Sequence, residues 1–175
     1  MPPDKLSYRS VQWLVFAFLA LHNLEEGLTM RLYFPRINEL LRESAPPTLL
    51  SAMPTPAQFY AALVCATLIP LLLIIFATTG RPSEFKSYLV AVVQAQVCLN
   101  VLVPHVPAAV MLGGYAPGLV TAVLLNLPFS YYFFRRSLRD AHVTRRGLIV
   151  VLLVALPLLL LSVRLLYALG ASFAS

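Results

Sequence analysis

Five long apolar runs constrain the fold of this chain more than any other feature of its sequence. They cover residues 11–28, 57–79, 85–103, 115–134 and 148–169. Each run is close to the ~20 residues that a helix needs to cross the hydrocarbon core of a bilayer. Backbone polar groups cannot stay unpaired in lipid, and the runs lack the alternation of barrel strands. We therefore expect an all-α membrane bundle of about five transmembrane helices, forming one domain over residues 1–175.

The composition supports a membrane protein. Only 11% of the residues are charged and 59% are apolar, with a mean hydropathy of +0.81. Soluble domains average about 25% charged residues. The net charge of +6 indicates no nucleic-acid partner, because the basic residues lie at the ends of the runs, without a folded domain to present them. The partners that we expect are membrane lipids, while the oligomeric state stays open.

The basic residues between the runs predict the orientation. In a five-span arrangement nine of them fall on the side of the N-terminus: Lys5, Arg9, Arg81, Lys86, Arg135, Arg136, Arg139, Arg145 and Arg146. The opposite side holds Arg31, Arg36 and Arg42. Because cytoplasmic loops carry an excess of Lys and Arg, the N-terminus is predicted inside and the C-terminus outside. The proline-containing stretch 30–56 is then the outer loop.

The first run contains the strongest functional signal. His22, Glu25 and Glu26 follow one another at spacings that place all three side chains on one stripe of a helix. An ionisable residue at the centre of a bilayer costs roughly 2.5–3.5 kcal/mol, so such a group needs a partner or a use. Four more polar residues are predicted at similar depth in the outer half of the bundle: Asn100, His105, Tyr115 and Arg164.

Three motifs resemble those of the HXXEE-domain family of small bacterial membrane proteins. They are the H-x-x-E-E of residues 22–26, a second histidine at His105, and the Y-x-P-G of residues 115–118. The resemblance implies a multi-span membrane protein, placed in the bacterial inner membrane, whose functional core contains these histidines and glutamates. It implies no particular reaction.

The same residues suit a divalent metal. A catalytic zinc commonly has three protein ligands and a water, with a further carboxylate as base. His22 and His105 with one of Glu25 and Glu26 would supply the ligands, and the other glutamate would act as the base. Zinc is favoured, although imidazole and carboxylate also bind iron and manganese. Two alternatives stay open, namely metal-free acid–base chemistry and a purely structural network.

Other polar residues have two interpretations each. Arg164 is either a counter-ion to the glutamates or a catalytic group that binds substrate. Tyr115 is either an interfacial aromatic residue at a helix start or a hydroxyl that orients a ligand. Gln96 and Asn100 give their helix a polar stripe, which either bonds to neighbouring helices or lines a polar cavity.

These features predict a membrane-embedded, metal-dependent enzyme. Its chemistry would be hydrolase-like, on a lipid, prenyl or peptide group, with an apolar or amphipathic substrate reaching the site from the outer leaflet. The alternative is a non-enzymatic membrane protein, either a small transporter or an assembly partner, in which the His/Glu cluster is a structural ion-pair network. The absence of an internal repeat argues against a transporter.

Overall fold

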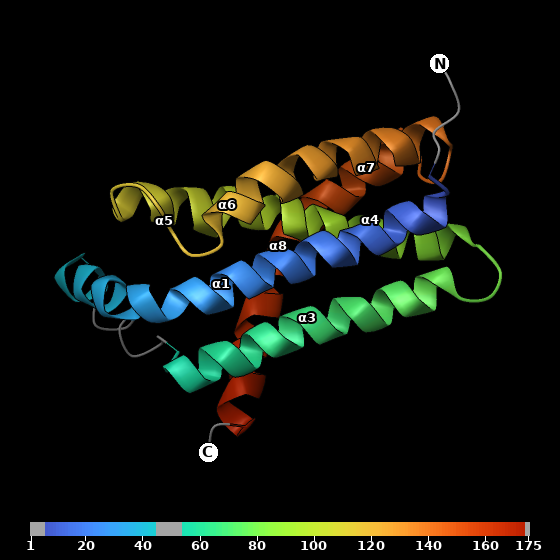
Figure 1. The fold of residues 1–175 in the computed structure, drawn as a ribbon. Coiled ribbons are helices and arrows are strands. Elements are labelled where there is room, and N and C mark those ends of the chain that lie inside the picture. Colours follow the sequence, from blue (N-terminus) through green and yellow to red (C-terminus); the bar gives the residue numbers. More distant parts are fainter. Residues whose placement is uncertain (1–5, 45–53, 174–175) are drawn as a thin grey trace.

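A computed structural model describes residues 6–44 and 54–173, and every regular element in these two ranges is helical. This confirms the predicted all-α fold. The elements, labelled in Figure 1 where there is room, are α1 (Tyr8–Ser44), α3 (Pro56–Thr78), α4 (Glu84–Asn100), η1 (Val101–His105), α5 (Val106–Met111), α6 (Leu119–Thr121), η2 (Ala122–Asn126), α7 (Leu127–Arg139) and α8 (Arg145–Phe173). Since α4 continues through η1 into α5, and α6 through η2 into α7, the chain makes five helical passes.

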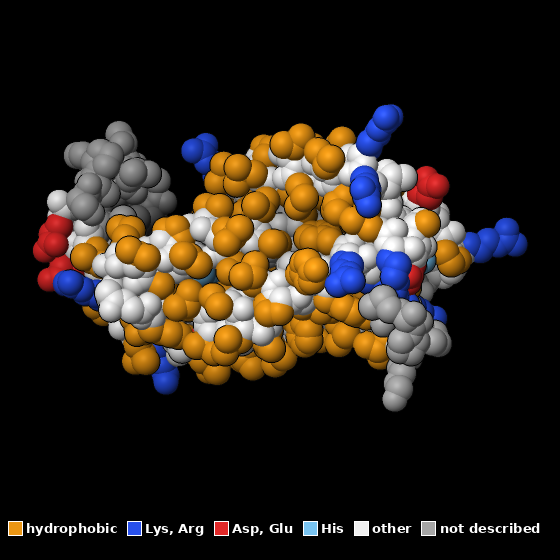
Figure 2. All heavy atoms as spheres, turned by 90° about the horizontal axis from the view of Figure 1, so that it is seen from above, with side chains coloured by type: hydrophobic (Ala, Val, Ile, Leu, Met, Phe, Trp, Pro, Cys, Tyr) orange, Lys and Arg blue, Asp and Glu red, His pale blue; other side chains and the backbone are white. Residues whose placement is uncertain are grey.

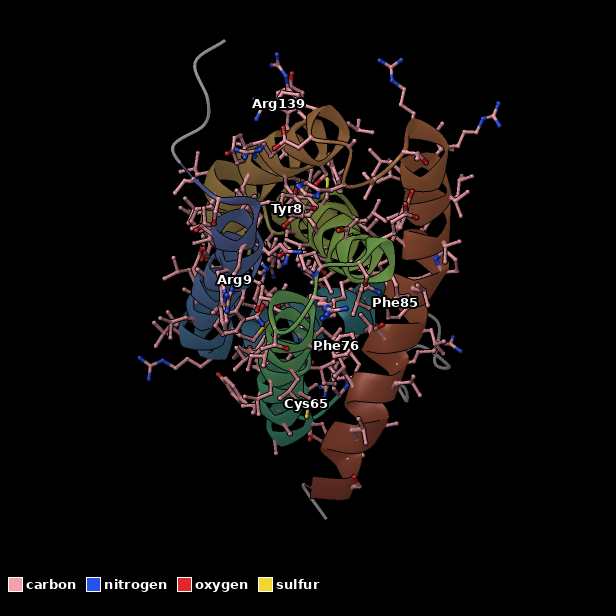
Figure 3. All side chains as sticks on the ribbon, turned by 90° about the vertical axis from the view of Figure 1, so that its right-hand side faces the viewer. Tyr8, Arg9, Cys65, Phe76, Phe85 and Arg139 are labelled. Atoms are coloured by element: carbon pink, nitrogen blue, oxygen red, sulfur yellow. The ribbon has the colours of Figure 1, made fainter. Side chains whose placement is uncertain are left out.

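Helix α4 lies at the centre of the bundle, in contact with α1, α3, α7 and α8. Viewed from one end, α1, α3, α4 and α7 are seen almost along their axes, while α8 runs down one side (Figure 3). Figure 1 also shows α8 inclined to the other helices. It nevertheless passes from one end of the bundle to the other, because Thr144 at its start bonds to Tyr88 of α4 and Gly170 near its end lies against Gln58 of α3.

The two ends of the bundle differ in character. At the first end, Tyr8 of α1 bonds to Ser137 of α7, with an Oη–Oγ distance of 3.0 Å, and its ring stacks on His142. The turn between α3 and α4 lies at this end too (Figure 1). Arg139 also belongs to this end, where it extends away from the bundle (Figure 3). The start of α1, the α3–α4 turn and the α7–α8 connection together form what we call the basic end. The opposite end, which we call the site end, holds η1, α5 and the 112–118 connection.

Three helical segments are long and apolar enough to cross a membrane: Pro56–Thr78, Glu84–Met111 and Arg145–Ser172. Their buried share is low, at 17%, 44% and 17%, so most of their apolar side chains face outward, as expected for helices surrounded by lipid. On the face shown in Figure 2, hydrophobic side chains cover the middle and most Lys and Arg side chains lie toward the right-hand end. These features indicate a membrane protein.

Helix α1 differs from its prediction, because it continues well past residue 28. It runs without interruption to Ser44, so residues 30–44 belong to a helix and not to the expected outer loop. Pro35 lies inside this helix, where it removes one backbone hydrogen bond, and good helix formers such as leucine, arginine and glutamate follow it. The Arg36–Glu39 ion pair, with an Nη1–Oε2 distance of 2.6 Å, spans one turn of the extension. Residues 45–53 of the expected loop lie outside the described residues.

The third and fourth passes also differ from simple spans, because each contains a wide π-type turn next to a proline. In η1, the Val106 N–H bonds to the Val101 carbonyl, and in η2 the Leu127 N–H bonds to the Ala122 carbonyl. Pro104 and Pro128 have no N–H for the usual bond to the fourth residue before them. The wider turn absorbs this loss, and the third pass therefore reaches Met111 beyond its predicted end near residue 103.

Candidate metal centre

His22, Glu26 and His105 form a compact group at the site end. Each offers one ligand atom, and these atoms all lie within 4.8 Å of one another. The two imidazole rings meet edge to face, with their centroids 4.6 Å apart, and His22 Nε2 lies 3.9 Å from Glu26 Oε2. His22 is 1% exposed and His105 is 4% exposed. Two imidazoles and a carboxylate are the donor set of many catalytic zinc sites.

The loop before α6 fixes both histidine rings. The Nδ1 atom of His22 lies 3.1 Å from the Gly118 carbonyl oxygen, and that of His105 lies 2.9 Å from the Pro117 carbonyl oxygen. A carbonyl can only accept a hydrogen bond, so each ring donates from Nδ1. In a neutral ring the Nε2 atom then carries a lone pair, which can accept a hydrogen bond or bind a metal ion. Metal-binding histidines are commonly oriented in this way, through a bond from their other nitrogen to a backbone carbonyl.

Asn100 lies beside both Nε2 atoms. Its Nδ2 is 3.0 Å from Nε2 of His105 and 3.5 Å from Nε2 of His22. In a regular helix, residues five apart point about 140° away from each other. The π-type turn of η1 brings position 105 round to the same side as position 100, which explains this contact. Asn100, predicted only as a polar lining residue, therefore borders the metal group directly.

Glu25 and Glu26 have different surroundings although they are adjacent. The Glu25 carboxylate accepts hydrogen bonds from the Tyr115 hydroxyl at 2.6 Å, from the Val120 and Thr121 N–H groups at 3.2 and 2.7 Å, and from the Thr121 hydroxyl at 2.5 Å. A carboxylate at a helix N-terminus satisfies N–H groups that have no partner within the helix. Glu25 thus anchors the loop whose carbonyls orient the histidines, whereas the Glu26 carboxylate lies beside His22 as part of the metal group.

Gly118 makes the approach of the loop possible. It has a φ of +79°, a conformation that side chains other than glycine rarely adopt. A Cβ atom at this position would lie 2.8 Å from Cε1 of His22, 3.0 Å from Cε1 of His105 and 3.3 Å from Cβ of Glu26. Two constraints therefore require glycine at this position of the Y-x-P-G motif: the backbone angle, and the lack of space for a Cβ atom beside the three members of the metal group.

A cavity of about 430 Å³ opens beside the metal group. One part of its wall is polar, with His22, Glu26, Asn100 and His105. The remainder is mostly apolar and comes largely from α3 and α8, including Phe59, Ala62, Leu63, Ala66, Ile69, Leu159, Val163 and Leu166. Ligand sites are typically concave and apolar, with a few convergent polar groups. The arrangement can therefore hold an apolar molecule against a metal-binding group.

The predicted site residues fall into two sets. His22, Glu26, His105 and Asn100 meet at the cavity, which Gln96 also lines, with its Nε2 3.4 Å from the Ser162 hydroxyl. Glu25 and Tyr115 bond to each other and support the loop.

Arg164 belongs to neither set. It is exposed on α8, forms no ion pair with a glutamate of the described ranges, and lines a second cavity of about 560 Å³.

Sequence reasoning missed two contributors to the site. Thr121 supports both His22, at an Oγ1–Nδ1 distance of 3.1 Å, and Glu25. Tyr167 of α8 lines the cavity together with Glu26. The position of Thr121, three residues after Gly118, was a usable signal, because hydroxyl residues are common in the first turn of a helix. Nothing in the uniformly apolar sequence of α8 distinguished Tyr167 from an interfacial aromatic residue.

The site can be compared with known proteins. A family model described as "protein of unknown function with HXXEE motif" matches residues 13–133. An uncharacterized protein of Bacillus subtilis (strain 168), YrkK, is 27% identical over 144 residues, which is 82% of this chain and 85% of that protein. No solved structure matches the chain. The matched segment contains the whole metal group and ends before α8 begins.

Proposed function

The chain belongs to the HXXEE family, and we propose that it is a membrane-embedded enzyme that uses one divalent metal ion for hydrolase-like chemistry. The observation that carries the proposal is the group of His22, Glu26 and His105, whose ligand atoms lie within 4.8 Å of one another, with both Nδ1 atoms held by neighbouring carbonyls. Such an arrangement supports metal binding because the backbone carbonyls already orient the two rings.

In this proposal His22, His105 and Glu26 are the protein ligands. Zinc is the favoured metal, while iron and manganese accept the same donors. A bound metal of this kind lowers the pKa of a coordinated water and polarises a carbonyl or phosphoryl oxygen. The cavity beside it would hold the substrate, with a lipid, prenyl or peptide group as the candidates.

We propose that Glu25 does not act as the base of this site. Its two carboxylate oxygens already accept four hydrogen bonds from the loop and the start of α6. We assign it a positioning role, in which it acts on the metal through the Pro117 and Gly118 carbonyls. The non-enzymatic alternative, a transporter or assembly partner with a structural ion-pair network, is less well supported. Arg164, the cation expected for such a network, lines the second cavity and forms no ion pair with a glutamate of the described residues.

Metal analysis of the purified protein tests the proposal. We expect about one metal ion per chain in the wild type and a large loss in His22→Ala and in Glu26→Gln. His142→Ala is the matched control, because His142 stacks on Tyr8 at the basic end, away from the site. Size-exclusion elution shows whether each variant is folded. If folded His22→Ala keeps its metal, or if the wild type binds none when supplied with zinc, iron or manganese, the proposal is wrong.

We also propose that the protein resides in the bacterial inner membrane, with the basic end in the cytoplasm and the site end toward the outer leaflet. The support is the excess of Lys and Arg at the basic end. Two cysteine substitutions test this orientation in a background without Cys65 and Cys98. Glu43 is exposed at the end of α1, on the side of the site end, and Pro82 is exposed in the α3–α4 turn at the basic end. An impermeant thiol reagent added to intact cells should label Glu43→Cys only. Labelling of Pro82→Cys alone would invert the orientation.

A further inference from the structure

Arg164 is the one predicted site residue that the metal centre does not explain. It lies eight residues before the end of the span Arg145–Ser172, about 12 Å along the helix axis. Its side chain is exposed, and it forms no ion pair within residues 6–44 and 54–173. A guanidinium inside a span is costly unless an anion or water reaches it. The described residues supply no such anion, and an anionic lipid head is one that a membrane offers.

The second cavity places Arg164 next to the metal centre. Its wall combines Arg164 with apolar residues of α8 and with Asn100, Val103 and Pro104. Four residues line both cavities: Asn100, Pro104, Leu159 and Val163. The two cavities therefore adjoin along the seam between α8 and the α4–η1 segment, and Asn100 stands between Arg164 and the histidines.

The two adjoining cavities together have the polarity of an amphipathic molecule. The first cavity is mostly apolar and suits a hydrocarbon chain. Among the described residues, Arg164 is the only charged one that lines the second cavity, and it is a cation. An arginine binds phosphate through two parallel N–H bonds and is weakly hydrated, which favours it at the membrane interface.

We propose that the protein binds an anionic lipid, with its phosphate on Arg164 and its hydrocarbon chain in the cavity beside the metal group. The bond between head and chain would then lie close to Asn100 and His105. This inference rests on the proposed function only in taking the lipid as the substrate. Lipid binding itself requires Arg164 and the cavity, and not the metal ligands.

Two lipids that differ only in a phosphate group test the proposal. Oleoyl lysophosphatidic acid and monoolein carry the same chain, and native mass spectrometry of the purified protein measures the binding of each. We expect lysophosphatidic acid to bind about tenfold more tightly to the wild type. Arg164→Gln should abolish this preference and Arg164→Lys should restore part of it. The control Arg31→Gln, an exposed arginine of α1, should leave the preference unchanged.

A second variant tests the chain-binding part. Ala66→Phe fills the first cavity and should weaken both lipids about tenfold or more. Equal binding of the two lipids by the wild type, or a preference that survives in Arg164→Gln, would overturn the phosphate contact. If inorganic phosphate binds as tightly as lysophosphatidic acid, and Ala66→Phe changes nothing, the site takes a soluble anion and the lipid proposal is wrong.

The outcome is separable from that of the proposed function. Metal content is measured on the same samples, and Arg164→Gln and Ala66→Phe should keep the wild-type metal content. Metal bound without any lipid preference would refute the lipid site alone. A lipid preference in a protein that binds no metal would refute the metalloenzyme alone.

Discussion

Substitution of Gly118 by alanine should disable the metal centre without any change to a metal ligand. The added Cβ would approach Cε1 of His22 to 2.8 Å and Cε1 of His105 to 3.0 Å. Neither ring can move away easily, because both are buried and hydrogen-bonded to the same loop that would carry the new methyl group. The loop must therefore withdraw, and its two carbonyls withdraw with it.

The expected free-energy cost of Gly118→Ala has two parts. An alanine held at a φ of +79° costs about 1–2 kcal/mol in backbone strain. Loss of the groups that orient metal-binding histidines typically lowers metal affinity 10–100-fold, which corresponds to about 1.4–2.7 kcal/mol. Only the second part should appear as weaker metal binding.

Gly113 offers a control that separates these parts. It has nearly the same backbone angle, with a φ of +76°, but a Cβ at this position would meet nothing within 4 Å. Gly113→Ala should therefore be destabilised like Gly118→Ala and bind metal like the wild type. Thermal unfolding and competition with a zinc chelator measure the two effects. Equal zinc affinity of the two variants would refute the assigned role of the loop.

Three further predictions concern other parts of the chain. Glu25→Gln should weaken metal binding about 10–100-fold in chelator competition, although Glu25 is not a ligand, and unchanged affinity would contradict its positioning role. Gln94→Leu should raise the free energy of unfolding by about 0.5–2 kcal/mol. The substitution removes the buried Oε1 atom, which has no hydrogen-bond partner, and loses only the hydrogen bond from Nε2 to the Ser130 hydroxyl. A lower unfolding temperature of the variant would contradict this prediction. Burial lowers the pKa of His142 below its ordinary 6.5, so its contribution to stability is complete above that pH and is lost as the pH falls through the lowered pKa. Melting temperatures at about pH 7 and pH 5 should therefore differ less in His142→Phe, which keeps the stack on Tyr8, than in the wild type.

The sequence predicted the members of the site because topology and spacing determine them. His22 and Glu26 are one helical turn apart, and His105 lies toward the site end of a pass that runs in the same direction as α1. Helices that end in the same layer bring such residues to similar depth. The fold class followed as directly from the length and polarity of the runs.

The division of roles between Glu25 and Glu26 could not be predicted in this way. Both lie on the same stripe of α1, and the choice depends on a loop more than 85 residues later in the chain that supplies donors to Glu25 alone.

The surroundings of Arg164 could not be predicted for a related reason. A helix as uniformly apolar as α8 has no polar stripe that shows which side faces its neighbours, so its rotation about its own axis is set by packing.

The π-type turn of η1 has a consequence for tracing this site among distant proteins. Such a turn is equivalent to one extra residue inserted into a regular helix. In an uninterrupted α-helix, positions four apart share a face, as positions 100 and 105 do here. A protein that lacks the extra residue could present the same amide and imidazole from an N-x-x-x-H spacing instead of the N-x-x-x-x-H found in this chain. A spacing between the asparagine and the histidine that is shorter by one residue is therefore compatible with an unchanged metal centre.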